Sequence, residues 1–170
     1  MHIQTERLTL HPFADEDILP LQELLMNETV AKTYMLPIFK SPEEAYALAK
    51  RLQVLSISEK KIVLGVYMQA RLIGIFNEVE MQDDRVELGY AIHPDHHNQG
   101  FATEALRALI LHFFQNGFSE VKTGAFSTNL ASIRVMEKAG MKKTQSKASV
   151  NYAGKIHHCV YYSIKKEDVL

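Results

Sequence analysis

The sequence lacks the features that mark secreted, membrane and nucleic-acid-binding proteins. It has one cysteine, Cys159, which excludes a disulfide within the chain and is typical of a protein from a reducing compartment. Its formal net charge of −1 gives no general attraction to nucleic acid or to an anionic membrane. The N-terminus, MHIQTERLTLHPF, has no apolar core of a signal peptide, and no apolar run approaches membrane-spanning length. We therefore expect a cytoplasmic protein with neither nucleic acid nor membrane as a partner.

Internal repeats, low-complexity segments and linkers of biased composition are also missing. The 170 residues fit one domain, 1–170, and 46% apolar with 23% charged residues is ordinary for a globular protein. Eight histidines include the group His93, His96 and His97, but no carboxylate stands at a diagnostic metal-ligand spacing. No metal site is predicted.

The apolar periodicity predicts secondary structure in the order βααβββαβαββ. Helices are expected at 15–26, from a capping Ser41 onward, at 101–115 and at 130–139. Strands are expected at 3–13, 62–69, 71–80, 86–93, 121–126, 141–148 and 156–164, and the turn between the last two contains Asn151 and Gly154. This order predicts one α/β domain, with a mixed, mostly antiparallel sheet and helices on both faces.

Residues 87–105, ELGYAIHPDHHNQGFATEA, join an apolar strand to the strongest amphipathic helix through a loop with one glycine, Gly100. N–H groups at such a helix start, with the positive end of the dipole, suit a phosphate or pyrophosphate. One glycine is too few for a P-loop or for the dinucleotide pattern G-x-G-x-x-G. Two interpretations stay open: the amides of residues 98–103 hold a pyrophosphate, or Gly100 only relieves a tight turn.

The segments GYAIHPDHHNQGFATEAL and STNLASIRVMEKAGM resemble the GNAT acetyltransferases, as do TERLTLHPF near the start and VYYSIKKED near the end. The likeness is nearer to the RimJ/RimL-type branch, which acetylates protein N-terminal amines, and it covers nearly the whole chain. It implies a GNAT-like fold, acetyl-CoA as co-substrate without a metal, and a primary amine as acceptor. His97 stands where the family usually has Arg or Gln, and its ring N–H is expected to reach a phosphate.

The resemblance implies a divided cofactor site. Amides of the pantetheine arm are expected to pair with a strand edge, and the pyrophosphate with the loop that follows. The strand residues are Tyr90, Ala91 and Ile92, and the loop residues are His97, Asn98, Gln99, Gly100, Phe101, Ala102 and Thr103. Asn129 is expected to bind pantetheine and Arg134 to approach a phosphate, or else Asn129 is a helix cap and Arg134 a solvated side chain.

Acetyl transfer to an amine requires a neutral amine, a stabilised oxyanion and a proton for the leaving thiolate. The resemblance implies Glu80, nine residues before Gly89, as general base, with Glu87 as second choice. The alternative is that these glutamates are solvated charges at a sheet edge. The tyrosine that many GNAT enzymes use as acid is replaced here by Met136, and Ser132 matches a serine of the RimL-type branch instead.

The predicted function is acetyl transfer from acetyl-CoA to a primary amine, above all a protein or peptide N-terminal α-amine, by direct attack in a ternary complex. An α-amine has a pKa near 7.7–8.0 and demands little of a base. A small amine such as a polyamine is an alternative acceptor. A non-catalytic acyl-CoA-binding module is the alternative of another class, and His97 and Met136 favour it. Monomer and homodimer both stay open.

Overall fold

The computed structural model describes residues 1–58 and 60–169. Its strands are β1 (Ile3–Gln4), β2 (Thr9–His11), β3 (Val63–Met68), β4 (Arg71–Gln82), β5 (Arg85–Ile92), β6 (Glu120–Phe126), β7 (Lys142–Tyr152) and β8 (Lys155–Lys165). Its helices are α1 (Ile18–Met26), α2 (Glu28–Ala31), α3 (Pro42–Ser56), α4 (Phe101–Gln115) and α5 (Leu130–Lys138), with 3-10 turns at η1 (Asp15–Asp17), η2 (Pro94–His96) and η3 (Lys166–Asp168). None of these helices is long and apolar enough to cross a membrane.

The strands are hydrogen-bonded in the order β1-β2-β3-β4-β5-β6-β8-β7. The pairs β1–β2, β2–β3, β3–β4, β6–β8 and β7–β8 are antiparallel, and β5 runs parallel to β6. The predicted α/β class and the mixed, mostly antiparallel sheet are therefore confirmed. The chain forms two compact units that divide β4 and β5 between them: residues 1–77 with 90–101, and residues 78–89 with the chain from 102 onward.

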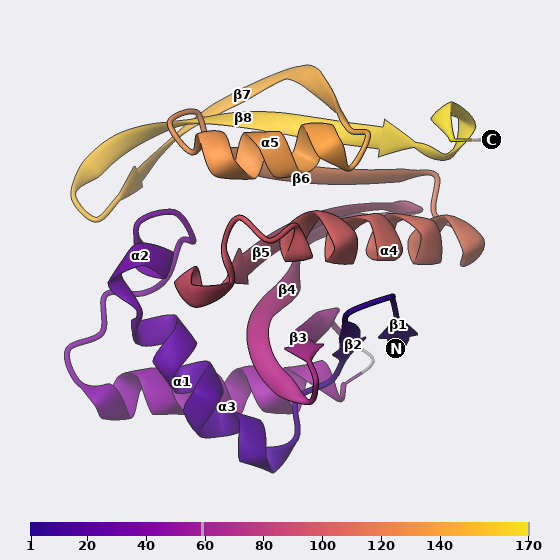
Figure 1. Cartoon of the computed structure of the whole chain (residues 1–170). Helices are drawn as coiled ribbons and strands as arrows, with labels where there is room; N and C mark the ends of the chain where they lie inside the picture. Colours follow the sequence, from indigo (N-terminus) through magenta and orange to yellow (C-terminus); the bar gives the residue numbers. More distant parts are fainter. Residues whose placement is uncertain (59, 170) are drawn as a thin grey trace. The chain divides into compact units, whose positions relative to one another are not determined.

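The first unit is built around a core of leucine, phenylalanine and β-branched side chains. Helices α1 and α3 lie side by side in it, and α3 also contacts β3 (Figure 1). The buried residues of this core include Phe13, Leu21, Leu25, Val63 and Ile75, with Leu48, Leu52 and Leu55 partly buried against them. Inside it, the Tyr67 hydroxyl donates to Asp17 Oδ2 at 2.6 Å, which satisfies a buried carboxylate.

The second unit contains the parallel pair, whose register runs from Arg85 opposite Glu120 to Leu88 opposite Thr123. Its longest elements are β7 and β8, which pair as a hairpin, and α5 runs alongside them (Figure 1). Helix α5 is fixed at its C-terminal end, where Tyr162 donates to the Glu137 carboxylate at 3.2 Å.

Four local features differ from the sequence prediction. The strand expected at 3–13 is two strands, because the Thr5 N–H bonds to Leu8 O at 2.9 Å and closes a turn. Helix α2 is additional, and Asn27 caps it by accepting from Thr29 and Val30 N–H groups. Asn151 lies inside β7, and the turn consists of Ala153 and Gly154, both with positive φ. Ser41 makes no side-chain capping bond to any described residue; the Glu44 carboxylate binds the Lys40 N–H at 2.8 Å instead.

Candidate functional site

The loop between β5 and α4 has a backbone suited to an anion. Asn98 (φ 58°) and Gly100 (φ 81°) are left-handed on either side of Gln99, and α4 begins at Phe101. Residues of alternating hand point successive N–H groups into a concave nest that attracts anions. The positive φ at Gly100 also explains why glycine stands there, since other L-residues rarely adopt it. The nest supports the pyrophosphate interpretation of this loop, and the positive φ of Gly100 fits the tight-turn interpretation equally well.

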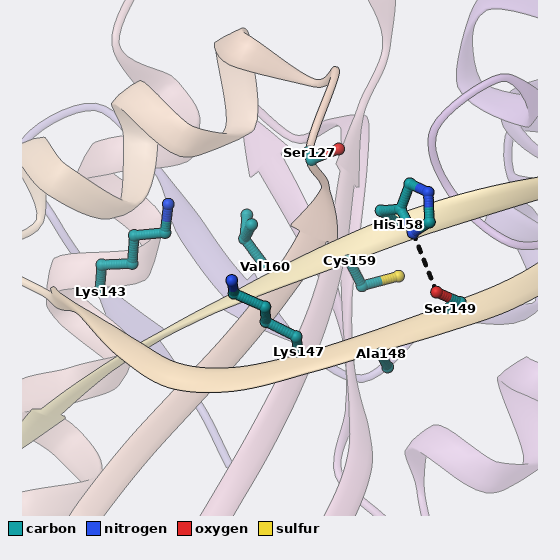
Figure 2. Close-up of a pocket in the computed structure, with 8 residues that line it drawn as sticks. All are labelled: Ser127, Lys143, Lys147, Ala148, Ser149, His158, Cys159 and Val160. Carbon is teal, nitrogen blue, oxygen red and sulfur yellow. Dashed lines mark hydrogen bonds between the residues drawn. The ribbon is translucent and has the colours of Figure 1, made fainter.

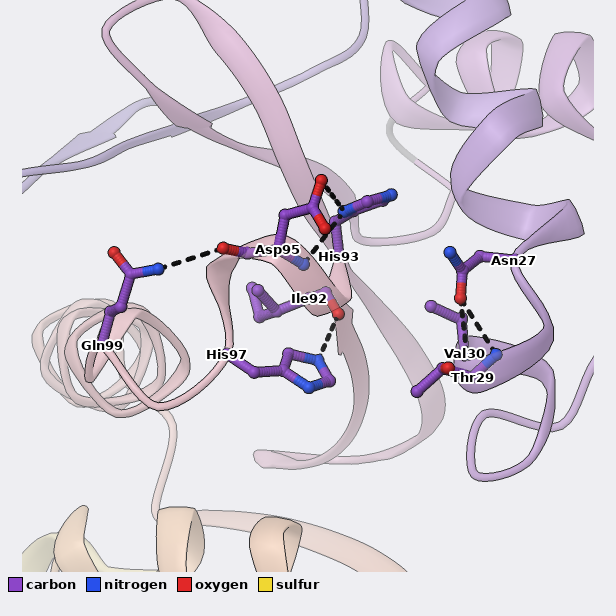
Figure 3. Close-up of polar contacts among 8 residues, drawn as sticks. All are labelled: Asn27, Thr29, Val30, Ile92, His93, Asp95, His97 and Gln99. Carbon is purple, nitrogen blue, oxygen red and sulfur yellow. Dashed lines mark hydrogen bonds and ion pairs between the residues drawn. The ribbon is translucent and has the colours of Figure 1, made fainter.

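Side-chain contacts hold the same loop in place. The His97 ring Nε2 lies 2.7 Å from the Ile92 carbonyl oxygen (Figure 3). A carbonyl only accepts, so Nε2 is the donor, and only Nδ1 is left to face a ligand. The Gln99 side-chain amide donates to Asp95 O at 3.1 Å, and the His93 Nδ1 accepts from the Asp95 N–H at 3.3 Å. One ring nitrogen of His97 is thus engaged with the protein's own backbone, and the expected ring contact to a phosphate stays a prediction.

Arg7 also contacts this loop, although sequence reasoning gave it no role. Its Nη1 donates to Gln99 O at 2.9 Å, and its guanidinium carbon lies 4.5 Å from the centre of the Phe101 ring. The two partners of the hydrogen bond are 92 residues apart in sequence, so no local pattern reveals it. The only available signal was a lone cation in the segment TERLTL.

Two histidine rings pack together beside the loop. The rings of His93 and His96 lie edge to face, with their centres 6.4 Å apart. Burial lowers the pKa of His96, and the charges of Arg71 and His93 lower it further. Among residues 1–58 and 60–169, no three His, Cys, Asp or Glu side chains are grouped so that they could hold a metal ion. The His96 ring also packs against the Phe101 ring, with centres 6.1 Å apart, at the start of α4.

The strand expected to hold pantetheine lies closely against β4. Ala91 and Ile92 are buried, and the His93 N–H donates to Ile73 O at 2.7 Å. A Cβ on Gly74 would lie 2.5 Å from Ala91 O and 2.5 Å from Ile92 Cδ1. Only glycine allows this approach, so Gly74 is a second residue that sequence reasoning missed. Its position inside an apolar strand was the available signal.

On α5, Asn129 is a helix cap, since its Oδ1 accepts from the Ser132 N–H at 3.2 Å. The Asn129 amide N–H groups are not used in that bond and keep the chemistry expected toward pantetheine. Ser132 is partly exposed in the first turn, and Arg134 is exposed. Met136 is fully buried and packs in the core.

The two candidate bases of the second unit differ in their surroundings. Glu80 is exposed on β4. The Glu87 carboxylate is mostly buried and lies 2.9 Å from Lys122 Nζ, which in turn lies 4.3 Å from the centre of the Tyr161 ring. The Glu87 carboxylate is thus engaged with an ammonium group of its own unit. Glu80 remains the first choice as general base on the family resemblance.

Cys159 is a packed thiol in β8. Burial raises its pKa, and the charge of Glu87 raises it further. It lines an open hollow of about 540 Å³ on β7 and β8, together with Ser127, Lys143, Lys147, Ala148, Ser149, His158 and Val160 (Figure 2). Within it, the Ser149 hydroxyl and His158 Nδ1 are hydrogen-bonded at 2.9 Å across the two strands. A thiol with a raised pKa has little thiolate at neutral pH, which argues against a nucleophilic role.

Comparison with known proteins identifies the family of this chain. Residues 7–142 match the model of the acetyltransferase (GNAT) domain. The chain belongs to the GNAT acetyltransferases. The N-acetyltransferase YoaA of Bacillus subtilis is 29% identical over 83% of this chain and 82% of its own length. The ribosomal-protein-serine acetyltransferase of Escherichia coli is 30% identical over 66% of each chain.

Solved structures agree with the family assignment. RimL, a ribosomal L7/L12 alpha-N-protein acetyltransferase solved in complex with coenzyme A, superposes with a TM-score of 0.81. The match covers 97% of this chain and 98% of that one at 16% identity, so it shows a shared fold. The predicted resemblance to RimJ/RimL-type GNAT enzymes is confirmed.

Proposed function

We propose that this protein transfers the acetyl group of acetyl-CoA to the α-amine at the N-terminus of a protein or peptide. Acetyl-CoA is assigned as the donor because left-handed residues, Asn98 and Gly100, stand in the loop immediately before α4 of a GNAT-family chain. The relative that acetylates a ribosomal-protein serine supports the acceptor class. One acetyltransferase domain spanning residues 1–170 is part of the proposal.

The donor's parts are assigned to separate residues. The pyrophosphate accepts from the backbone N–H groups of residues 98–103, with the positive end of α4 behind them. The pantetheine amides pair with the backbone of residues 90–92, which continue β5 past its parallel register with β6. The side-chain amide of Asn129 donates to the same arm, and Arg134 supplies a positive charge toward a phosphate.

The chemistry is one displacement at the thioester carbonyl. Glu80 accepts a proton from the ammonium form of the acceptor, the neutral amine forms a C–N bond, and the C–S bond breaks. The leaving thiolate takes its proton from the Ser132 hydroxyl, and Ser132 regains a proton from the attacking nitrogen as that nitrogen becomes the amide. Met136, at the position of the family's tyrosine, is buried and has no proton to give. The ion pair with Lys122 makes Glu87 a structural charge in this scheme.

Calorimetry with coenzyme A, followed by thiol release from acetyl-CoA across a panel of amines, tests the proposal. Peptides with a free N-terminal Ser or Ala should release thiol, and the same peptides with a blocked α-amine should not. Release with polyamines alone would move the acceptor to small amines. Tight coenzyme A binding without release for any amine would indicate a non-catalytic binding module.

Two substitutions test the residue roles. Glu80→Gln and Ser132→Ala should each lower kcat by about 10²-fold, the usual scale for one general acid or base, with the Kd for coenzyme A unchanged. Glu23→Gln, an exposed carboxylate on α1, is the matched control and should keep wild-type turnover. Full activity in Glu80→Gln would remove that residue as the base.

A further inference from the structure

We propose that Arg7 is the positioning residue of the phosphate loop and that it acts by aiming the Gly100 N–H at the cofactor's pyrophosphate. The inference rests on the proposed donor. It concerns contacts between the N-terminal segment and the loop, both of which lie within the first unit.

One guanidinium reaches three consecutive residues of the loop. Nη1 donates to Gln99 O at 2.9 Å, Nη2 lies 3.4 Å from the place of a Cβ on Gly100, and the guanidinium carbon lies 4.5 Å over the Phe101 ring. Such a planar, delocalised cation both donates in a fixed fork and stacks on an aromatic face. Lysine offers neither geometry, so arginine has a specific use here.

The hydrogen bond to Gln99 O fixes an amide that points the other way. In a planar trans peptide the carbonyl oxygen and the following N–H project from opposite sides of the bond. Holding Gln99 O therefore sets the direction of the Gly100 N–H. The neighbouring left-handed residue, Asn98, and Gly100 itself leave this peptide unit little support from regular structure. Arg7 supplies that support from behind the loop.

The turn that carries Arg7 is itself closed by hydrogen bonds. The Thr5 N–H donates to Leu8 O at 2.9 Å, and the Leu8 N–H donates to Thr5 Oγ1 at 2.9 Å. Leu8 is buried, which ties the turn to the core. The guanidinium is thus presented by a short, fixed segment. The positive charge also lies beside the peptide that faces an anion, which adds attraction.

His97 holds the loop at a second point. The family usually has Arg or Gln where His97 stands, and the His97 Nε2 is engaged with Ile92 O at 2.7 Å. His97 therefore holds the first residue of the loop, and Arg7 holds the peptide that leads to Gly100. The loop is fixed at two points by side chains of different segments.

The test compares two ligands that differ in the pyrophosphate. Arg7→Met should weaken coenzyme A binding about tenfold by calorimetry, the scale of one lost hydrogen bond to a charged group. Binding and turnover of pantetheine and S-acetylpantetheine, which lack the pyrophosphate, should not change. With acetyl-CoA the KM should rise while kcat at saturation stays at the wild-type value. Arg7→Lys should recover only part of the affinity.

Arg51→Met, an exposed arginine on α3, is the matched control and should bind coenzyme A like the wild type. Thermal unfolding of each variant separates a folding defect from a binding defect. Equal losses for coenzyme A and pantetheine, or no loss for coenzyme A, would overturn the assignment of Arg7. If the wild type binds coenzyme A but transfers no acetyl group, the proposed function fails and the calorimetric test of Arg7 still decides.

Discussion

Gly74 is the place where one added methyl group tests whether residues 91 and 92 hold the cofactor. A Cβ there would lie 2.5 Å from Ala91 O, whereas real Cβ contacts essentially never fall below 3.0 Å. In Gly74→Ala, β4 and β5 must therefore separate by about half an ångström in the first unit. The hydrogen bond from His93 N–H to Ile73 O, now 2.7 Å, lies beside that contact and would lengthen.

Overpacking of this kind costs about 1–3 kcal/mol. For a chain of this length each kcal/mol lowers Tm by about 2–4 °C, so we expect a loss of about 2–12 °C. The cofactor effect follows from the same displacement. In an aligned catalytic site a misplacement of about 1 Å lowers the rate about 10²-fold. On the same scale, half of that displacement should raise the Kd for coenzyme A about tenfold.

Thermal unfolding of Gly74→Ala measures the loss of Tm. Calorimetry with coenzyme A, carried out well below the Tm, measures the change in Kd. Gly65→Ala is the matched control, because its Cβ would lie 2.6 Å from the Tyr67 ring and hydroxyl and would disturb the same unit without touching β5. It should lower Tm and leave the Kd for coenzyme A unchanged. A folded Gly74→Ala protein with wild-type Tm and Kd would refute the reasoning.

Two further predictions concern titratable groups. The Tyr34 hydroxyl donates to Asn77 Oδ1 at 2.6 Å, and burial raises its pKa above the ordinary 10.0. Because the folded-state pKa is raised, the stability that Tyr34 contributes is complete below pH 10 and is lost as pH rises further. Tyr34→Phe should lower the free energy of unfolding by about 1 kcal/mol at pH 7. In urea unfolding at rising pH, the variant should lose less stability than the wild type. For Cys159, burial and Glu87 raise the pKa, so iodoacetamide should react more slowly than with a free cysteine at pH 8, and Glu87→Gln should speed the reaction. If mass spectrometry shows Cys159 alkylated as fast as a free cysteine, the prediction for Cys159 is wrong.

The helices that frame the site could be predicted because their signals are local. The apolar period of α4 and the glycine after it define both ends, and Gly117 adopts φ 94° as a helix stop requires. Helix α5 follows the same logic, with Asn129 at its start and Gly140 (φ 89°) after its end. The strand expected at 3–13 is divided because the alternation around Leu8 and Leu10 does not extend across the polar residues 5–7, which form the turn.

The residues that sequence reasoning missed are those whose role depends on distant partners. Arg7 meets Gln99 across 92 residues, and Gly74 is required by the backbone of Ala91 on the neighbouring strand. The direction of the His97 ring also depends on a contact outside its own segment, with the carbonyl of Ile92. Its identity marks a departure from the family pattern, but only the fold shows that Nε2 binds Ile92 O. Long-range contacts decide how a locally predictable loop is supported.

This support also bears on the hypothesis of a binding module without turnover. His97 and Met136 favoured that hypothesis by sequence. His97 holds the loop's backbone, and the loop's donors to an anion are backbone amides, so His97 affects how donors are aimed rather than how the amine reacts. Met136 is a fully buried residue of α5 and has no proton to donate. Ser132, in the first turn of the same helix, is the group proposed to donate the proton in place of the family's tyrosine. Neither departure removes a group from the reaction that Glu80 and Ser132 are proposed to perform. Thiol release by the wild type separates an enzyme from a binding module, and where release is seen, substitution of Glu80 and Ser132 tests the proposed reaction more directly than restoring the family's Arg at position 97.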